Sequence, residues 1–257
     1  MTKIAIHSDL HMELQGAPMY WLEFTPDILV LAGDVHKACD IQKILPLLTE
    51  FRPNMDIVFV PGNHEYYGCK NMIETEQALR EEFSKSKQIH FLQCDSKVVQ
   101  GVRFIGCTGW TTLSALKNEE FPNVEPVIAD RINDFHYIGM GDHKFSTQEC
   151  IELGHQQREW LKQQLQATQD EKLPSMVVTH FSPSLQFRNK QHSIDEITAY
   201  FCNEHIDLID SYAPDYWVFG HTHFNVDEIR GRTRIISNQH GYGRECSDYQ
   251  PNFMIEL

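Results

Sequence analysis

Five short apolar segments of the chain end in side chains that can bind a metal ion, and this pattern limits the fold more than any other feature. The segments have the length and β-branched composition of strands, at residues 4–7, 28–32, 57–60, 176–179 and 217–219. Continuously apolar strands are typical of a sheet that is covered on both faces, as in layered α/β proteins. Because the ends of neighbouring strands meet at one edge of a sheet, the side chains that follow them are expected to lie together.

The side chains at these strand ends are imidazoles, carboxylates and one amide. They are Asp9, His11, Asp34, Asn63, His64, His180, His221 and His223. Imidazole and carboxylate bind Mn, Fe, Zn, Co or Ni, and the absence of cysteine from the set argues against a structural thiolate zinc site. Glycines precede Asp34, Asn63 and His221, and we expect them to let the backbone turn sharply beside an ion.

Each of these residues also has an ordinary structural explanation. A histidine after a strand is commonly a hydrogen-bonded core residue, and Asp34 would cap a helix that begins at Val35. The repetition of the pattern at five strand ends favours the metal interpretation. For other histidines we expect a surface or core position, namely His7, His90, His136, His143, His192 and His205.

The chain resembles the calcineurin-like metallophosphoesterase superfamily in a series of five motifs that stand in the family's order. They are Asp9-x-His11, Gly33-Asp34, Gly62-Asn63-His64-Glu65, Thr179-His180 and Gly220-His221-Thr222-His223. The resemblance implies an α/β (α+β) fold of two packed β-sheets flanked by helices, a four-layer sandwich. We expect residues 1–257 to form a single domain of this kind.

The resemblance also implies a site for two divalent transition-metal ions, Mn, Fe, Zn, Co or Ni, at the strand ends. Asp34 would bridge both ions, and His64 would lie near the scissile phosphate without binding metal. Two ions roughly 3.5–4 Å apart can activate a bridging hydroxide that attacks phosphorus. His64, with an unperturbed pKa of about 6.5, would supply a proton or positive charge to the leaving oxygen. The first ion would be held by Asp9, His11 and His223, and the second by Asn63, His180 and His221.

The second motif departs from that of the superfamily's protein phosphatases. Those enzymes extend it to Gly-Asp-x-x-Asp-Arg, whereas Lys37 and Ala38 stand at the last two positions here. The aspartate that would orient His64 and a phosphate-binding arginine are therefore absent, as is the arginine at the position of Tyr66. The pattern is similar to the small bacterial-type phosphoesterases and phosphodiesterases. A diester is slightly favoured over a monoester, because a monoester carries more charge to neutralise.

Residues 110–145 show no clear period, and we expect an irregular insertion that lies over one end of the sheet. A helix is expected over residues 71–87, with Ile73, Leu79 and Phe83 on roughly one side. Further helices are expected from a capping box at Ser146 to about residue 166 and, possibly broken, over about 193–211. Pro46 is expected to interrupt or kink the segment after Cys39. Five residues are candidates for the substrate pocket, with packing as the alternative for each: His36, Tyr67, Trp110, Arg131 and His240.

Composition bears on the class of function. The 257 residues include 22 Lys+Arg and 36 Asp+Glu, which gives a net charge of −14. Such a chain has no electrostatic footprint for long nucleic acid and repels anionic membranes. The chain has an odd number of cysteines, seven, and no C-x-x-C motif. Both features favour reduced thiols in the cytoplasm over a disulfide framework. No apolar run approaches the length of a membrane span.

We therefore expect a cytoplasmic, metal-dependent phosphoric ester hydrolase that acts on a small phosphodiester or phosphomonoester. No membrane partner is expected. The alternatives are a non-catalytic interaction scaffold on the same fold and a nuclease. All seven expected ligand positions and His64 are present, which argues against the scaffold, and the negative net charge argues against a nuclease for long nucleic acid.

Overall fold

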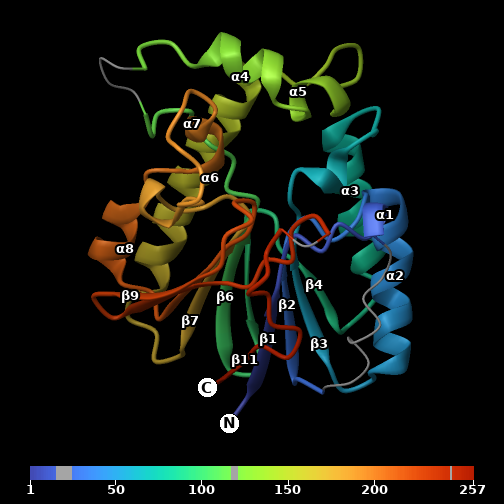
Figure 1. The fold of residues 1–257 in the computed structure, drawn as a ribbon. Coiled ribbons are helices and arrows are strands. Elements are labelled where there is room, and N and C mark those ends of the chain that lie inside the picture. Colours follow the sequence, from blue (N-terminus) through green and yellow to red (C-terminus); the bar gives the residue numbers. More distant parts are fainter. Residues whose placement is uncertain (16–24, 117–120, 244) are drawn as a thin grey trace.

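The computed structural model describes residues 1–15, 25–116, 121–243 and 245–257, and two β-sheets form its centre (Figure 1). The first sheet has the order β11-β1-β2-β3-β4. Strands β1 to β4 are parallel, and β11 is antiparallel to β1. The strands are β1 (Lys3–His7), β2 (Ile28–Ala32), β3 (Asp56–Val60), β4 (Ile89–Phe91) and β11 (Met254–Glu256).

The second sheet has the order β5-β6-β7-β8-β10-β9. Its four inner strands are parallel, and the outer strands β5 and β9 are antiparallel to their neighbours. The strands are β5 (Asp95–Val99), β6 (Val102–Cys107), β7 (Ser175–Thr179), β8 (Tyr216–Val218), β9 (Val226–Arg230) and β10 (Thr233–Ser237).

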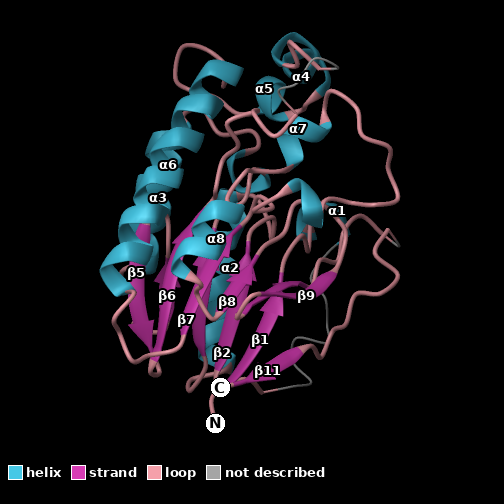
Figure 2. Cartoon of the chain, turned by 90° about the vertical axis from the view of Figure 1, so that its left-hand side faces the viewer, coloured by secondary structure: helices cyan, strands magenta, loops and turns pink. Residues whose placement is uncertain are grey.

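Helices cover the outer face of each sheet, so the described chain has four layers (Figures 1 and 2). Helices α2 (Ala38–Phe51) and α3 (Met72–Phe83) pack on the first sheet. Helices α6 (Thr147–Thr168) and α8 (Ile206–Tyr212) pack on the second. The remaining helical turns are α1 (Met12–Gln15), η2 (His64–Tyr66), α4 (Glu125–Arg131), α5 (Asp134–Tyr137), η3 (Leu185–Phe187) and α7 (Thr198–Phe201).

The main core lies between the two sheets. Fully buried side chains of both sheets meet there, including Ile6 and Val30 from the first and Phe104 and Val178 from the second. Separate apolar clusters lie between each sheet and its helices. Strands such as β2, in which every residue is buried, therefore contact apolar neighbours on both faces. The expected fold of two packed sheets flanked by helices is confirmed.

The helices follow the local signals of the sequence, with two corrections. Ser146 and Glu149 form the expected capping box at the start of α6. The helical stretch of residues 193–211 is broken, as α7 and α8 show. Ile73 does not share the buried side of α3 with Leu79 and Phe83 but is 64% exposed, because Met72 faces the core in its place. Pro46 does not interrupt the helix after Cys39, since α2 continues through it.

The stretch 110–145 contains the short helices α4 and α5, where we expected irregular structure throughout; residues 117–120 lie outside the described part. Both helices lie above the ends of the sheets in Figure 1. The short strands β4 and β11 and the outer strands β5 and β9 had no clear signal in the sequence. Among the described residues, no helix is both long and apolar enough to span a membrane.

Candidate metal centre

The ends of five strands bring the ligand candidates to one edge of the two sheets. Asp9 and His11 follow β1, and Asp34 follows β2. These strands are adjacent and parallel, so their carboxyl ends point the same way. In the same manner Asn63 and His64 follow β3, His180 follows β7, and His221 and His223 follow β8.

The backbone of this edge is unusual, because several non-glycine ligand candidates have left-handed φ angles. Such angles cost free energy in a residue with a side chain and are typical of functional sites. Hydrogen bonds hold the loops in place: Asp9 Oδ1 accepts from the His221 N–H at 2.9 Å, and the Asp34 carbonyl accepts from the His11 N–H at 3.0 Å. The angles are 54° at Asp9, 42° at His11, 53° at Asp34, 69° at His221 and 47° at His223.

The three glycines of the motifs serve two purposes. Gly33 has a φ of 84° and supplies the turn that we expected. Gly62 and Gly220 do not have a positive φ and are needed for space instead. A Cβ at Gly220 would lie 2.6 Å from Asp9 Oδ2, and a Cβ at Gly62 would overlap Asp34 Oδ1. Sharp turning therefore explains only one of these glycines.

Three groups of potential metal ligands lie at this edge among the described residues. Two of them share no residue, and the third, His11, Asp34 and His64, takes one residue from each and adds His64. One ligand atom each from Asp9, His11 and His223 lies within 4.8 Å of the others, and the same holds for Asp34, His180 and His221. Asn63 adjoins the second group, with its Oδ1 3.0 Å from His180 Nε2. The structure thus places all seven expected ligands in two neighbouring groups.

Asp34 lies where the two groups meet. Its Oδ2 is 3.4 Å from His180 Nε2 in one group and 3.9 Å from His11 Nε2 in the other. The same oxygen is 4.0 Å from Nε2 of His64. A single carboxylate oxygen therefore adjoins both groups and the neighbouring histidine.

The residues fit divalent transition-metal ions. Nε2 of His221 is buried and has no hydrogen-bond partner among the described residues, although it belongs to the second group. A buried nitrogen without a partner is costly unless a ligand occupies the space before it. Nδ1 of His180 lies 2.9 Å from the Ala32 carbonyl oxygen, which orients the ring as is common in metal-binding histidines.

Neighbouring histidines keep the carboxylates of Asp9 and Asp34 ionised. Burial opposes ionisation of Asp34, but His180 and His64 outweigh it and hold the pKa of this carboxyl well below its usual value. Burial likewise opposes protonation of His180, yet the Asp34 carboxylate raises its pKa to about 9. For His223, Asp9 and Glu245 overcome burial and raise the pKa to about 10. The metal-free site therefore holds protons where cations would bind.

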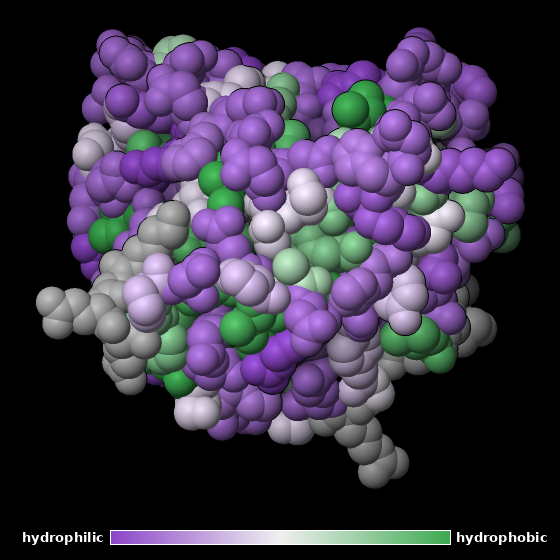
Figure 3. Space-filling model, turned by 90° about the horizontal axis from the view of Figure 1, so that it is seen from above, coloured by the Kyte–Doolittle hydropathy of each residue, from purple (hydrophilic) through white to green (hydrophobic). Residues whose placement is uncertain are grey.

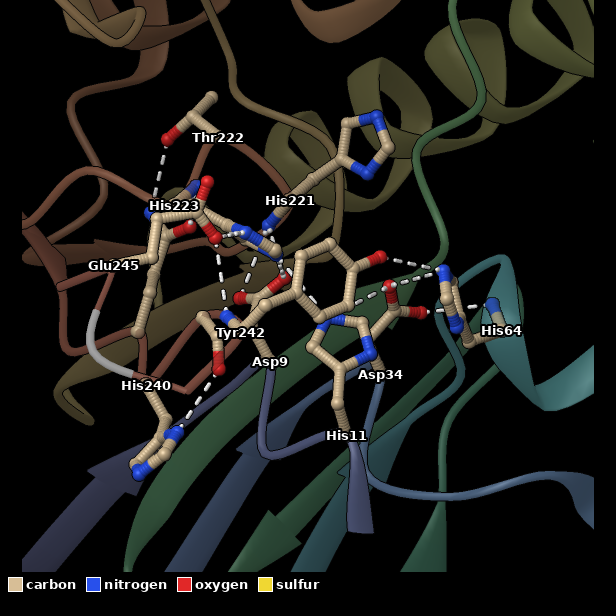
Figure 4. A network of polar contacts seen from close by, with 12 residues as sticks. Asp9, His11, Asp34, His64, His221, Thr222, His223, His240, Tyr242 and Glu245 are labelled. Atoms are coloured by element: carbon tan, nitrogen blue, oxygen red, sulfur yellow. Dashed lines mark hydrogen bonds and ion pairs between the residues drawn. The ribbon is translucent and has the colours of Figure 1, made fainter. Parts of the chain in front are cut away.

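His64 stands beside the ligand groups and contacts two residues that the sequence did not identify. Its Nδ1 lies 2.9 Å from Glu13 Oε1. Its Nε2 lies 3.1 Å from the Tyr242 hydroxyl, a contact that Figure 4 shows. Burial lowers the pKa of His64, but the carboxylates of Asp34 and Glu13 outweigh this and raise it. The ring also stacks on Tyr67 at a centroid distance of 4.0 Å. These contacts hold one nitrogen of His64 on a carboxylate and direct the other toward Tyr242.

Asp134 is a further residue that the sequence did not reveal. It is buried at the start of α5 and accepts a hydrogen bond from Asn63 Nδ2 at 2.9 Å, which leaves Asn63 Oδ1 facing the ligand group. It also accepts from the hydroxyls of Tyr67 and Tyr200. Burial raises the pKa of Asp134 despite these hydrogen bonds. The segment over the sheet ends thus orients one ligand candidate.

Glu65 connects the loop after β2 to the loop after β3 through hydrogen bonds. Its buried carboxylate accepts from the backbone N–H groups of Asp34 at 3.0 Å, Val35 at 2.8 Å and Gly62 at 2.7 Å. Burial and the nearby Asp34 charge raise the pKa of Glu65 to about 7. Glu65 belongs to the Asn-His-Glu motif, so the sequence contained it, but its structural role depends on contacts between strands.

A cavity of about 500 Å³ opens beside the ligand groups. Of the five pocket candidates, Tyr67 and Arg131 line it. Trp110 is buried in the apolar cluster under α4 and does not line it. His36 lies 3.7 Å from Asp40, and His240 lies apart from the ligands in Figure 4; neither lines the cavity.

Further residues that belong to none of the sequence motifs also line the cavity. Among them are Arg188, Asn189 and His192 from the stretch between η3 and α7, and Tyr242 and Glu245 near the C-terminus. His192 was expected at the surface or in the core, and it is exposed at the cavity. Figure 3 looks from above on the side where the helices cover the sheet ends, and hydrophilic residues predominate there.

The chain belongs to the calcineurin-like phosphoesterase family, because the model of that family matches residues 2–225. The resemblance inferred from the motifs is thereby confirmed. The family uses divalent metals, and the chain is accordingly a hydrolase of the phosphoesterase type. An uncharacterized protein of Acanthamoeba polyphaga mimivirus is 26% identical over 97% of this chain and 95% of its own length.

Solved structures show the same fold. The phosphopantetheinyl hydrolase of Mycobacterium tuberculosis is 19% identical, with a TM-score of 0.69 over 97% of this chain and 93% of that one. A dimetal phosphatase of Danio rerio is 12% identical, with a TM-score of 0.50 over 92% of this chain and 86% of that one. At these identities the likeness concerns the fold alone.

Proposed function

We propose that this protein is a dinuclear metal-dependent phosphoesterase that hydrolyses a small phosphate ester, with a diester favoured over a monoester. The observation that carries the proposal is the convergence of seven ligand side chains in two groups that share Asp34, with His64 beside them. Asp9, His11 and His223 would hold one ion. Asn63, His180 and His221 would hold the other, and Asp34 would contact both.

When bound, the two ions would supply positive charge at the phosphate and a nucleophile from water at neutral pH. The protein's own residues then bind and orient the ester. His64 is placed to donate a proton from Nε2 to the leaving oxygen, because Nδ1 is held by Glu13. The Tyr242 hydroxyl lies 3.1 Å from Nε2, so an oxygen can approach this nitrogen within hydrogen-bonding distance.

Hydrolysis of two chromogenic esters tests this proposal. Bis-p-nitrophenyl phosphate and p-nitrophenyl phosphate would be compared with added Mn²⁺ and again after chelation. We expect chelator-sensitive hydrolysis with the diester preferred. Asp34→Asn should abolish it. His64→Ala should lower the hydrolysis of a phenyl or alkyl ester about 10²–10⁴-fold, the usual contribution of a general acid, and should affect the nitrophenyl esters much less.

His155→Ala is the matched control, because His155 is an exposed histidine on α6 and should leave turnover unchanged. Wild-type turnover in both Asp34→Asn and His64→Ala would refute the proposal. Two bound metal equivalents without hydrolysis of either ester would favour the interaction scaffold.

A further inference from the structure

The cavity beside the ligand groups contains one charged side chain, Arg188, with no oppositely charged neighbour among the described residues. Each carboxylate that lines the cavity already has a partner. Such contacts include Asp34 with His180 at 3.4 Å, Asp134 with Tyr67 at 2.6 Å, Asp195 with Arg131 at 3.9 Å and Glu245 with His223 at 2.6 Å.

Only some of the hydrogen-bond donors of Arg188 have a partner among the described residues. Its Nη1 donates to the Leu185 carbonyl at 3.2 Å, and its Nε is buried without a partner among the described residues. No ion pair in the described part of the chain includes it. The next residue, Asn189, donates from Nδ2 to the His223 carbonyl at 3.4 Å, so this stretch is attached to a ligand loop.

An unpaired guanidinium is unexpected in this protein. Its acidic residues outnumber its basic ones, 36 to 22, so counter-ions for an arginine are abundant. Arg131, the other arginine at the cavity, does face a carboxylate. A guanidinium presents donors in a planar fork that fits the two oxygens of a carboxylate or phosphate. The missing counter-ion of Arg188 is therefore best supplied by a ligand in the cavity.

We propose that Arg188 binds a second anionic group of the substrate, a phosphate or carboxylate separate from the scissile phosphate. This inference rests on the proposed function and narrows its substrate to esters with an anionic substituent. Tyr67, Ile197 and Phe201 also line the cavity and offer apolar surface to the rest of the substrate.

A series of p-nitrophenyl phosphodiesters that differ only in the second substituent tests the proposal. The substituents would end in a methyl group, a carboxylate, a phosphate or a quaternary ammonium group. We expect wild-type kcat/KM to be about 10–100-fold higher for at least one anionic ester than for the methyl ester, as a hydrogen bond between charged groups provides. Comparison of the carboxylate ester with the phosphate ester shows which of the two anions is preferred. In Arg188→Gln the ratio of kcat/KM between the anionic ester and the methyl ester should fall close to one, mainly because KM for the anionic ester rises.

Lys190→Gln is the control, because it removes the same charge two residues away. Lys190 lies 3.3 Å from Glu228 and does not line the cavity, so this variant should keep the wild-type ratio. An equal loss of the ratio in both variants would overturn the inference in favour of general electrostatics. Equal kcat/KM for all esters in the wild type would overturn it while the proposed function stands. Hydrolysis of none would refute both.

Discussion

Oε1 of Glu13 lies 2.9 Å from Nδ1 of His64 and 3.3 Å from Nδ1 of His11. One carboxylate thus orients a ligand candidate and the histidine that does not belong to the ligand set. Burial opposes ionisation of Glu13, yet its hydrogen bonds with His11 and His64 lower its pKa to about 2. Glu13 therefore stays ionised and takes the orienting role for which Lys37, in the second motif, is unsuited.

Glu13→Gln should weaken the orientation of His64. A nitrophenolate leaves without a proton, whereas phenolate or alkoxide needs one, so the loss should depend on the leaving group. We expect kcat to fall about 10–100-fold for phenyl or alkyl esters and much less for nitrophenyl esters. Glu50→Gln, an exposed position on α2, is the control. Equal losses on all esters, with less bound metal, would show that Glu13 acts through His11 instead.

Asp134→Ala should lower both stability and metal binding. It would leave the buried partners Asn63 and Tyr200 without an acceptor, at a cost of about 1–3 kcal/mol for each group in the free energy of unfolding. Loss of a residue that orients a ligand typically lowers metal affinity about 10–100-fold. Denaturant unfolding and metal titration would measure the two effects. Asp130→Ala, exposed on α4, should show neither.

Metal binding should release protons and strengthen as the pH rises. The pKa of His180 is raised to about 9 and that of His223 to about 10, so both imidazoles are protonated at pH 7 in the metal-free chain. A protonated imidazole cannot bind a cation, and affinity should therefore increase from pH 6 toward the raised pKa values. Calorimetry in buffers of different ionisation enthalpy would count the protons. Binding at pH 7 without proton release would contradict this expectation.

Gly220→Ala should disturb the first ligand group selectively. A Cβ there would lie 2.6 Å from Asp9 Oδ2 and displace that carboxylate. We expect reduced metal content in a folded protein. Gly231→Ala is the matched control: Gly231 has a φ of 59° in the turn between β9 and β10 and open space around it. It should cost about 1 kcal/mol in stability and retain the metals.

The sequence predicts the ligand candidates well because they depend on local features. Each follows an apolar strand, and parallel strands in adjacent positions bring such residues together whatever the rest of the chain does. Glu13 continues the same spacing, two residues after His11, so the Asp9-x-His11 motif extended by two positions would have included it. The aspartate that orients the histidine at the position of His64 in the protein phosphatases belongs to the second motif, so the resemblance does not point to Glu13.

The substrate cavity, in contrast, depends on how distant segments fold over the sheet ends. Asp134 lies in the stretch without period, and Arg188 lies outside every element expected from the sequence. Their positions follow from contacts that no local pattern encodes: Asp134 accepts from Asn63, and Asn189, next to Arg188, donates to the His223 carbonyl. Trp110 was a candidate for the substrate pocket, but this large aromatic residue is buried among apolar neighbours instead. Pocket residues of this kind can be identified only from the tertiary structure.

A titration of metal-free protein with Mn²⁺ tests the two-metal site most directly, with bound metal and hydrolysis of the diester followed together. The account predicts that activity rises until two equivalents are bound per chain. It further predicts that Asp34→Asn binds less metal and stays inactive. Full activity in the metal-free protein or in Asp34→Asn would contradict it.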